Sequence, residues 1–497
     1  MLFNSLSFLV FFPIVTILYF ILPHRFRWVW LLGASYYFYM SWNPKYALLM
    51  AASTIITYLS GILIERANRQ ENVKKRDAQR KLWVALSFSL NLSILFFFKY
   101  FDFALDSLNH LLLFIGVRAV TPSYDVLLPV GISFYTFQAL SYTMDVYRGE
   151  LPAEKNLGKY ALFVSFFPQL VAGPIERSKN LLTQVYERHY FDYDRVKNGL
   201  LLMIWGLFQK IAVADRVAVI VNEVYDHYSA YTGAHVALAT LLFSVQIFCD
   251  FSGYSDIAKG AAQVMGFRLM DNFRQPYFST SIHEYWRRWH ISLSTWFRDY
   301  LYIPLGGSRC SRLKKYRNIM ITFLVSGLWH GANWTYVAWG GLHGAYHVLG
   351  DMLKPVRRKV SALTKINAGV LPVRLLQGFF TFALVSFAYI FFRAPAVGSA
   401  FDIIKQIFVN FSLTKLLDSE LLTVIGFNRF DVLFTVGAIV ILFVVQMLQT
   451  KIDVLAALSK KRRWFRWAVY LSLIFGLLVY VIIYRSGASQ EFIYFQF

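Results

Sequence analysis

Long apolar runs, separated by clusters of Lys and Arg, are the feature that most constrains how this chain can fold. The 497 residues are 57% hydrophobic and only 16% charged, whereas soluble domains carry about 25% charged residues. Apolar runs of about 18 residues or more are typical of transmembrane helices. The sequence therefore predicts an all-α polytopic integral membrane protein, folded as one domain over residues 1–497.

About ten membrane spans are expected, together with re-entrant and interfacial helices. Two hydrophobic stretches contain too much Pro, Gly and polar residue for a lipid-facing helix, so residues 126–147 are expected to form a broken, buried helix and residues 160–178 a re-entrant segment. Residues 101–125 are expected to form an interfacial helix and loop. The predicted spans are 5–22, 28–41, 45–64, 82–100, 196–225, 234–251, 374–393, 431–449 and 467–485, with a further apolar helix beginning near residue 318.

The basic residues fix an orientation for these spans. The net charge is +22, and an N-terminus on the outer side places every strongly basic connection in the cytoplasm, as the positive-inside rule requires. The basic connections include residues 65–81, which we expect to be a solvated loop, and residues 309–318. Because the charge is explained by membrane orientation, a nucleic-acid partner is not expected and membrane lipid is.

Two other sequence features narrow the class of protein. The N-terminus lacks the basic region and the small-residue cleavage site of a signal peptide, so the first apolar run is expected to be retained. Cys249 lies in an apolar run and Cys310 in a basic one, so a disulfide is not expected.

The stretch Asn318–Leu349 carries the first candidate for chemistry. At 1.5 Å per residue, a helix that starts at the preceding basic connection places His330 roughly 18 Å deep, near the middle of a hydrocarbon layer about 30 Å thick. Ionisable groups at that depth usually face a cavity or a partner. Trp329, Asn333 and Trp334 are close to this histidine in the sequence. The structural alternative is a buried histidine that is hydrogen-bonded between helices.

A second candidate stretch, residues 281–307, combines arginine, tryptophan and histidine. It contains His290, Trp286, Arg288, Trp296 and Arg298. Guanidinium groups bind phosphate and aromatic rings stack on bases, so this stretch would suit a nucleotide-bearing donor such as coenzyme A. An interfacial helix with an aromatic belt is the alternative.

The remaining candidates are weaker. His343 and His347 are four residues apart and could share a helix face as a metal pair, but no carboxylate completes a metalloprotease motif, so packing is favoured and no metal is expected. Asp145, Asp250 and Asp256 end apolar runs and are read as caps or interface residues. No nucleophile elbow, phosphate-binding loop or dinucleotide fingerprint is present.

The two stretches together resemble a known family. "RRWHISLSTWFRDYLYIPLGG", followed by "SGLWHGANWTYVAWGGLHG", is similar to the signature of membrane-bound O-acyltransferases. "LPVGISFYTFQALSYTMDVYRGE", "FPQLVAGPIER", "FCDFSGYSDIAKGAAQVMGFRLMDNFRQPY" and the ending "FIYFQF" resemble its bacterial alginate O-acetyltransferase branch. The core motifs cover residues 126–350, and further spans follow over 374–485.

The resemblance implies helices around a central tunnel, in the inner (cytoplasmic) membrane of a bacterium. It implies a cytoplasmic acyl donor, acetyl-CoA, with no bound cofactor, and an acceptor hydroxyl from the opposite face. Extracytoplasmic acetyltransferase partner proteins would pass the acetyl group to a polysaccharide, alginate or a similar exopolysaccharide. The family's histidine matches His330, and His290 matches its second polar position.

The chemistry of acyl transfer suggests roles for these residues. His330 would be the general base for the hydroxyl, and His290 would orient the donor or stabilise the tetrahedral intermediate. Asn333, on a neighbouring helix face, could hydrogen-bond a reactant. Trp329, Trp296 and Trp286 would shape the tunnel, and Arg288 and Arg298 would bind the donor.

Other functions remain open at this stage. Peptidoglycan and cellulose are alternative acceptors, and an acyl-histidine relay is an alternative to direct transfer. A transport protein and a non-catalytic scaffold subunit of a polysaccharide acetylation complex are further alternatives.

Overall fold

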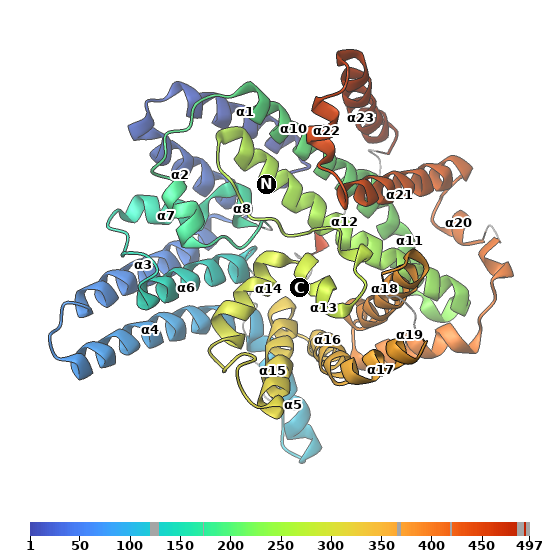
Figure 1. The fold of residues 1–497 in the computed structure, drawn as a ribbon, viewed down its shortest axis with the longest axis horizontal. Coiled ribbons are helices and arrows are strands. Elements are labelled where there is room, and N and C mark those ends of the chain that lie inside the picture. Colours follow the sequence, from blue (N-terminus) through green and yellow to red (C-terminus); the bar gives the residue numbers. More distant parts are fainter. Residues whose placement is uncertain (120–128, 172, 365–368, 418–419, 485–491, 494–497) are drawn as a thin grey trace. The chain divides into compact units, whose positions relative to one another are not determined.

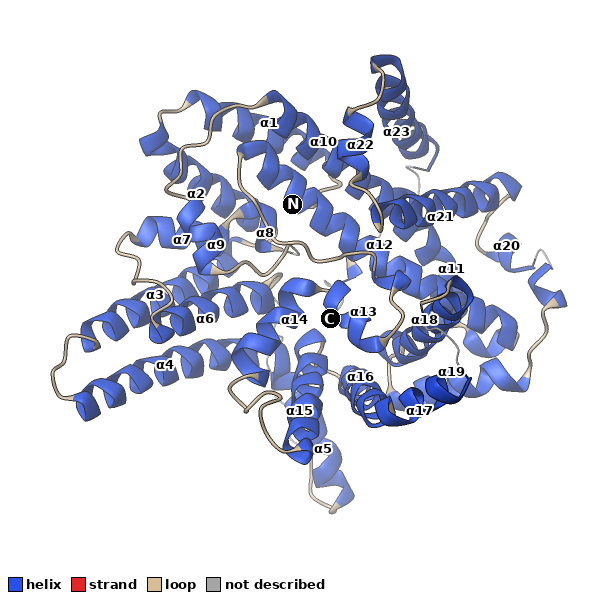
Figure 2. Cartoon of the chain, viewed as in Figure 1, coloured by secondary structure: helices blue, strands red, loops and turns tan. Residues whose placement is uncertain are grey.

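The computed structural model describes residues 1–119, 129–171, 173–364, 369–417, 420–484 and 492–493. Over these residues the protein is built from helices, and none of them forms a strand (Figure 2). The predicted all-α class is therefore confirmed. Residues 126–128, 485 and most of the "FIYFQF" ending lie outside the described residues.

The chain divides into two compact units, which are described separately. The first comprises Met1–Met203 and Ile257–Met270, and the second comprises Ile204–Asp256 and Asp271–Phe497. Helices α10 (Tyr193–Leu207) and α12 (Gly233–Met265) contribute residues to both units. This division does not test the expectation of one integral domain, which stays a prediction.

The first unit follows the predicted apolar runs closely. Its capped helices begin where the sequence supplies a capping side chain: the Ser5 hydroxyl accepts from the Phe8 N–H before α1, and the Asn43 amide oxygen accepts from the Lys45 N–H before α3. Its main helices (Figure 1) are α1 (Leu6–Ile21), α2 (His24–Met40), α3 (Pro44–Ala67), α4 (Val73–Leu95), α5 (Phe101–Phe114), α6 (Ile132–Arg148), α7 (Leu157–Ser165), α8 (Phe167–Leu170) and α9 (Ser178–Gln184).

The predicted solvated loop over residues 65–81 is wrong. Helix α3 continues to Ala67 and α4 begins at Val73, so only residues 68–72 connect them. Lys, Arg, Gln and Ala favour helix as well as water, and their charge marks solvent exposure without ending a helix. Residues 101–114 likewise follow α4 without a loop, through a π-helical turn at Phe96–Tyr100.

The two stretches of this unit that mix polar and apolar residues are buried, as predicted. The helix of the first stretch is unbroken over its described residues, from Ile132 to Arg148, so the break predicted within residues 126–147 is wrong there. The second stretch is interrupted between α7 and α8, while its re-entrant course through the membrane stays a prediction. Helix α6 begins after Gly131, whose φ is +75°. Between α7 and α8 the backbone breaks at Phe166, and the amides of Gln138 and Gln169 both donate to the carbonyl of Phe163, at 2.6 and 2.8 Å. A carbonyl that is freed at a helix break needs such donors when it is buried.

The second unit holds the C-terminal spans and the candidate site. A π-helix, Phe208–Ala214, joins α10 to α11. The α-helices of this unit are α11 (Asp215–Asp226), α13 (Ile282–Arg288), α14 (Ile291–Phe297), α15 (Arg312–His330), α16 (Trp334–Met352), α17 (Lys354–Thr364), α18 (Leu371–Arg393), α19 (Val397–Val409), α20 (Glu420–Val424), α21 (Arg429–Gln449), α22 (Val454–Ser459) and α23 (Arg463–Tyr484).

Five helices among the described residues are long and apolar enough to cross a membrane. They are α3, the continuous helix from Val73 to Phe114, α12, α18 and α21. The protein is therefore a multi-pass membrane protein, while the expected total of about ten spans stays a prediction. Predicted span 196–225 corresponds to α10, the π-helix and α11 in succession.

Helices α15 and α16 form a closely packed antiparallel pair (Figure 1). A Cβ atom added at Gly340 would lie 2.2 Å from the carbonyl oxygen of Phe323, and one added at Gly327 would lie 2.2 Å from that of Tyr336. Small residues let helix backbones approach in membrane proteins. This contact brings the end of α15, and with it His330, against α16.

Replacing one glycine of this contact should destabilise the protein. Gly340→Ala puts a methyl group into the Phe323 carbonyl, so we expect a loss of about 1–3 kcal/mol, seen as a lower Tm in detergent. Gly341→Ala is the matched control, because its Cβ would lie 3.5 Å from Leu324 Cδ2, an ordinary contact. Equal Tm values for the two variants would contradict the close packing.

Candidate active site

His330 is the last residue of α15 and is 3% exposed. The helix ends there because Gly331 is extended, with φ −162°, and a Cβ at Gly331 would lie 2.1 Å from the ring of Tyr336. The chain then turns at once into α16. The imidazole is thus held at a short, crowded corner between two helices.

His290 lies at the corner between α13 and α14. Its φ is +42°, a left-handed conformation that is uncommon outside glycine and often occurs at functional sites. Asn272 stabilises this corner: its carbonyl accepts from the N–H of Ile291 at 2.9 Å, and its side chain bonds to Ser292 at 2.6 Å and Ser255 at 2.9 Å. Asn272 is 1% exposed, so these bonds are shielded from water.

The two histidines lie close together in an aromatic enclosure. Their ring centroids are 6.3 Å apart, and His290 is fully buried. The rings around them, with centroid distances to the nearer histidine, belong to Phe251 (4.6 Å), Trp329 (5.0 Å), Trp339 (5.0 Å) and Phe392 (5.5 Å). The structure therefore brings together three of the predicted site residues, His330, His290 and Trp329.

Trp286 lies in the next layer of this enclosure. Its ring is 5.8 Å from that of Trp339, and its indole N–H donates to Nδ1 of His343 at 3.2 Å. His347 packs against Phe323 at 4.9 Å and against His283 at 5.6 Å. These contacts agree with the packing role that was predicted for His343 and His347.

The other predicted site residues have different local partners. Arg288 forms an ion pair with Glu284 at 2.5 Å, and Arg298, which is 59% exposed, pairs with Asp299 at 2.8 Å. Trp296 is buried and packs against Phe297 at 5.5 Å and Tyr300 at 5.1 Å. Their predicted donor-binding and tunnel-shaping roles stay predictions.

Asn333 is not on the same helix as His330, contrary to the sequence-based expectation. Because α15 ends at His330, Asn333 becomes the N-cap of α16, and its side-chain oxygen accepts from the N–H of Thr335 at 2.9 Å. Its amide nitrogen donates to the carbonyl of Pro395 at 3.0 Å. The spacing of three residues assumed a continuous helix, which the glycine at 331 interrupts.

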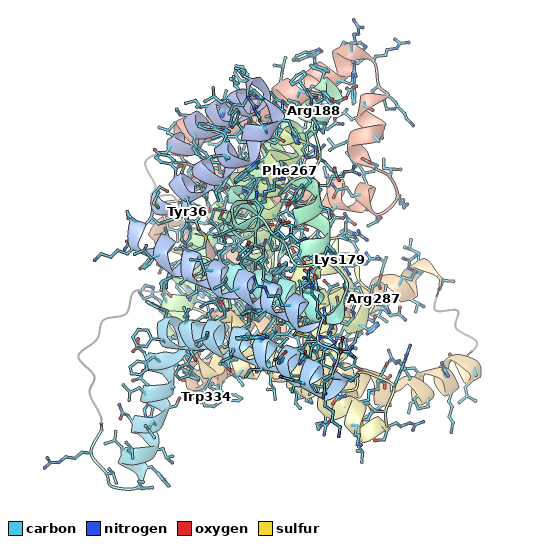
Figure 3. The ribbon with its side chains drawn as sticks, turned by 90° about the vertical axis from the view of Figure 1, so that its left-hand side faces the viewer. Tyr36, Lys179, Arg188, Phe267, Arg287 and Trp334 are labelled. Carbon is cyan, nitrogen blue, oxygen red and sulfur yellow. The ribbon has the colours of Figure 1, made fainter. Side chains whose placement is uncertain are left out.

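The two ends of helix α16 differ in the charge of the side chains around them. At the far end of α16, Asp351 pairs with Lys315 at 2.6 Å and with Lys354 at 2.5 Å. Trp334, at the start of α16, is 57% exposed. Figure 3 shows Arg287 and Trp334 on opposite sides of the unit. The basic end is the one that the positive-inside rule assigns to the cytoplasm.

A buried ion triad was missed by sequence reasoning. The ammonium of Lys210 lies 2.9 Å from Asp215 and 2.6 Å from Asp250, and Lys210 and Asp250 are 4% and 3% exposed. Asp250 is in the interior of α12, not at its end, so its expected role as a cap or interface residue is wrong. The sequence did contain a feature that could have predicted this triad, because all three ionisable residues lie within apolar runs.

The geometry of the histidine pair suits proton transfer at a reacting carbonyl. Two buried imidazoles in an aromatic enclosure offer an acceptor for a hydroxyl proton and a donor for a developing oxyanion. Exclusion of water strengthens both interactions and suppresses hydrolysis of a reactive intermediate.

The hydrogen bonds of Asn272 should be important for the stability of the His290 corner. Asn272→Ala leaves Ser292 and Ser255 without this buried partner, so we expect a loss of about 1–3 kcal/mol, measured as a lower Tm. The comparison variant is Ser294→Ala, which removes one hydroxyl bond to the Trp289 carbonyl at 3.1 Å from a partly exposed position and should lower Tm less. The reverse order would contradict this role.

Known proteins are similar in sequence to this chain over most of its length. The sequence model of the membrane-bound O-acyltransferase family matches residues 150–392, which include both histidines. The chain is 41% identical over 409 residues to the probable alginate O-acetylase AlgI of Azotobacter vinelandii, covering 82% of this chain and 78% of that protein. It is also 41% identical to that of Pseudomonas aeruginosa, covering 82% and 75%.

A relative with a different acceptor is also similar. The peptidoglycan O-acetyltransferase of Helicobacter pylori is 34% identical over 437 residues, covering 82% of this chain and 79% of that protein. Similarity of this extent, together with the family match across the histidine pair and the helical membrane fold, places the chain in the membrane-bound O-acyltransferase family.

Proposed function

We propose that this protein transfers an acetyl group from a cytoplasmic donor, across the membrane, for O-acetylation of an exported polysaccharide. The observation that carries the proposal is the buried pair His290 and His330, 6.3 Å apart, inside the segment that matches an acyltransferase family. The similarity to alginate O-acetylases supports acetyl as the acyl group and a polysaccharide as the final acceptor.

His330 is the general base of this reaction. It takes the proton of the acceptor hydroxyl as the oxygen attacks the thioester carbonyl carbon. The tetrahedral intermediate then expels the thiolate by breaking the C–S bond, and the proton passes from His330 to the thiolate sulfur. The products are an acetate ester and a thiol, so no net proton or electron is consumed.

His290 is the oxyanion donor or orienting group. Its left-handed backbone, φ +42°, and the hydrogen bonds of Asn272 beneath it hold the ring in place before a substrate arrives. A preorganised donor of this type gains strength in a water-excluded site. Trp329 and Trp339 pack against His330 at 5.0 Å each and keep water out.

The donor is acetyl-CoA, and it arrives from the basic, cytoplasmic side. Arg287, Lys315 and Lys354 lie at that end of the site's helices, where cations favour a phosphorylated carrier. It is a substrate, not a resident cofactor. The protein would be located in the bacterial inner membrane, and extracytoplasmic acetyltransferase proteins would be its partners.

Alginate or a similar exopolysaccharide is the favoured final acceptor. Peptidoglycan is the second candidate, because the relative named for that acceptor is 34% identical over 82% of this chain. A transport or scaffold role without catalysis is the remaining alternative, and the histidine variants separate it from catalysis.

Removing either histidine should strongly reduce acetylation. We expect His330→Ala to lower the acyl-transfer rate by about 100-fold or more, as general-base loss does, and His290→Ala to lower it by about 100- to 1,000-fold, as loss of an oxyanion donor does. The measurement is ester content of the extracellular polymer, together with CoA release by the purified protein, at matched protein levels.

His227→Ala is the control for these variants. His227 has a side chain 62% exposed and pairs only locally, with Glu223 at 3.1 Å, so its loss should leave ester content unchanged. Normal ester content in the His330→Ala strain would leave only the scaffold or transport role.

A further inference from the structure

One wall of the aromatic enclosure around the histidine pair is formed by Phe251 of helix α12. The ring of Phe251 packs edge-to-face against His290, with centroids 4.6 Å apart and an interplanar angle of 85°. Phe251 and His290 are both fully buried. The proposed proton transfer and oxyanion contact do not use this ring, although it touches one of the two reacting imidazoles.

A second aromatic layer closes the space behind Phe251. The ring of Phe273 packs edge-to-face on Phe251 with centroids 5.0 Å apart, and the ring of Phe492 packs on it at 6.0 Å. Phe273 also packs against Trp289, the residue before His290, at 5.0 Å. An interior packed in this way cannot admit an extra methylene group without displacing a ring.

Polar contacts hold Phe251 in place from both sides along α12. The carboxylate of Asp250, the preceding residue, pairs with Lys210 at 2.6 Å. The hydroxyl of Ser252, the following residue, donates to the amide oxygen of Gln209 at 2.5 Å. Both partners are on the π-helix that joins α10 to α11. Because these contacts flank the phenylalanine, its ring cannot move aside through a rotation of the helix.

The His330 side of the enclosure is more polar. The ring of Phe392 packs against His330 at 5.5 Å and also lines a polar cavity, together with Asn333 and Arg393. An apolar acyl chain is stabilised by contact with apolar side chains and not by a polar lining. The wall formed by Phe251 is therefore the better place for the acyl chain.

The proposed mechanism brings the acyl group to this wall. A thioester oxygen that accepts a hydrogen bond from His290 lies about 2.9 Å from the donating ring nitrogen. The methyl carbon of an acetyl group is two bonds from that oxygen, so it lies within contact distance of the rings that touch His290. On the apolar side of the enclosure, that ring is Phe251.

We infer that Phe251 is a specificity-determining residue that limits the transferred acyl group to acetyl. The inference rests on the proposed function and adds the basis of its selectivity for the acyl chain. In the wild type, a propionyl group would have to push its additional methylene into the Phe251 ring. Removing the ring leaves an apolar space beside the carbonyl group that a longer acyl chain can fill.

The test is a competition between two acyl donors in membranes of the host strain, which keep the full-length protein with its partners. An equimolar mixture of acetyl-CoA and propionyl-CoA is supplied, and the acceptor is the host exopolysaccharide after alkaline removal of its esters. Membranes with His330→Ala give the background. The ratio of propionyl to acetyl esters then reports the ratio of the two kcat/KM values.

Phe251→Ala should raise this ester ratio by about tenfold or more, because one methylene in an apolar pocket changes selectivity by about 10- to 200-fold. Phe251→Leu removes less of the side chain and should raise the ratio by a smaller factor. Because both esters are measured in one sample, the ratio does not depend on the amount of folded protein.

Phe248→Ala is the matched control. Phe248 is on the same helix and is 2% exposed, but its ring contacts in the described part of the chain are with Phe273, Tyr277 and Trp289, not with either histidine. Its truncation should lower Tm about as much as Phe251→Ala does and should leave the ester ratio unchanged.

An unchanged ester ratio in both Phe251 variants, or an equal rise in Phe248→Ala, would overturn the inference. Loss of both esters in Phe251→Ala and in Phe251→Leu would also overturn it, because the ring would then support the histidine pair and not limit the acyl chain. A wild type that forms no esters above the His330→Ala background would instead refute the proposed function itself.

Discussion

The candidate site depends on the backbone contact between α15 and α16. Gly327 and Gly340 leave no room for a Cβ atom, since each would lie 2.2 Å from a carbonyl oxygen of the other helix. Because the two helix backbones are so close, and because α15 ends at His330 just before the tight turn at Gly331, the imidazole of His330 is held against α16. Bulkier residues here would separate the helices, and the aromatic enclosure formed by Trp329, Trp339 and Phe392 could not close.

Polar groups inside this apolar protein are stabilised in three different ways. Asn272 holds the strained His290 corner by hydrogen bonds to two serines and a backbone N–H. Lys210 is neutralised by two aspartates, and the Phe163 carbonyl is bonded by two glutamine amides. In each case the alternative is an unpartnered group in a medium of low dielectric constant, which is costly.

Much of the architecture could be predicted from the sequence, because apolar runs and basic clusters are local signals. They indicated the all-α membrane class and the helices α3, α12, α18 and α21. The predictions failed where a local signal has two meanings. The charged residues over 65–81 were interpreted as a solvated loop, but most of them belong to the ends of helices α3 and α4. The spacing of Asn333 from His330 assumed one helix, but Gly331 ends it.

The sequence by itself determined that His330 and His290 are chemical candidates, from depth, composition and family resemblance. Only the tertiary structure decided that their rings lie 6.3 Å apart, that Arg298 pairs with Asp299 on an exposed face, and that Lys210 lies between Asp215 and Asp250. These residues come from separate helices, so their distances depend on how helix faces pack and where each helix ends. No periodicity within one segment carries that information, because it arises from contacts between segments far apart in the chain.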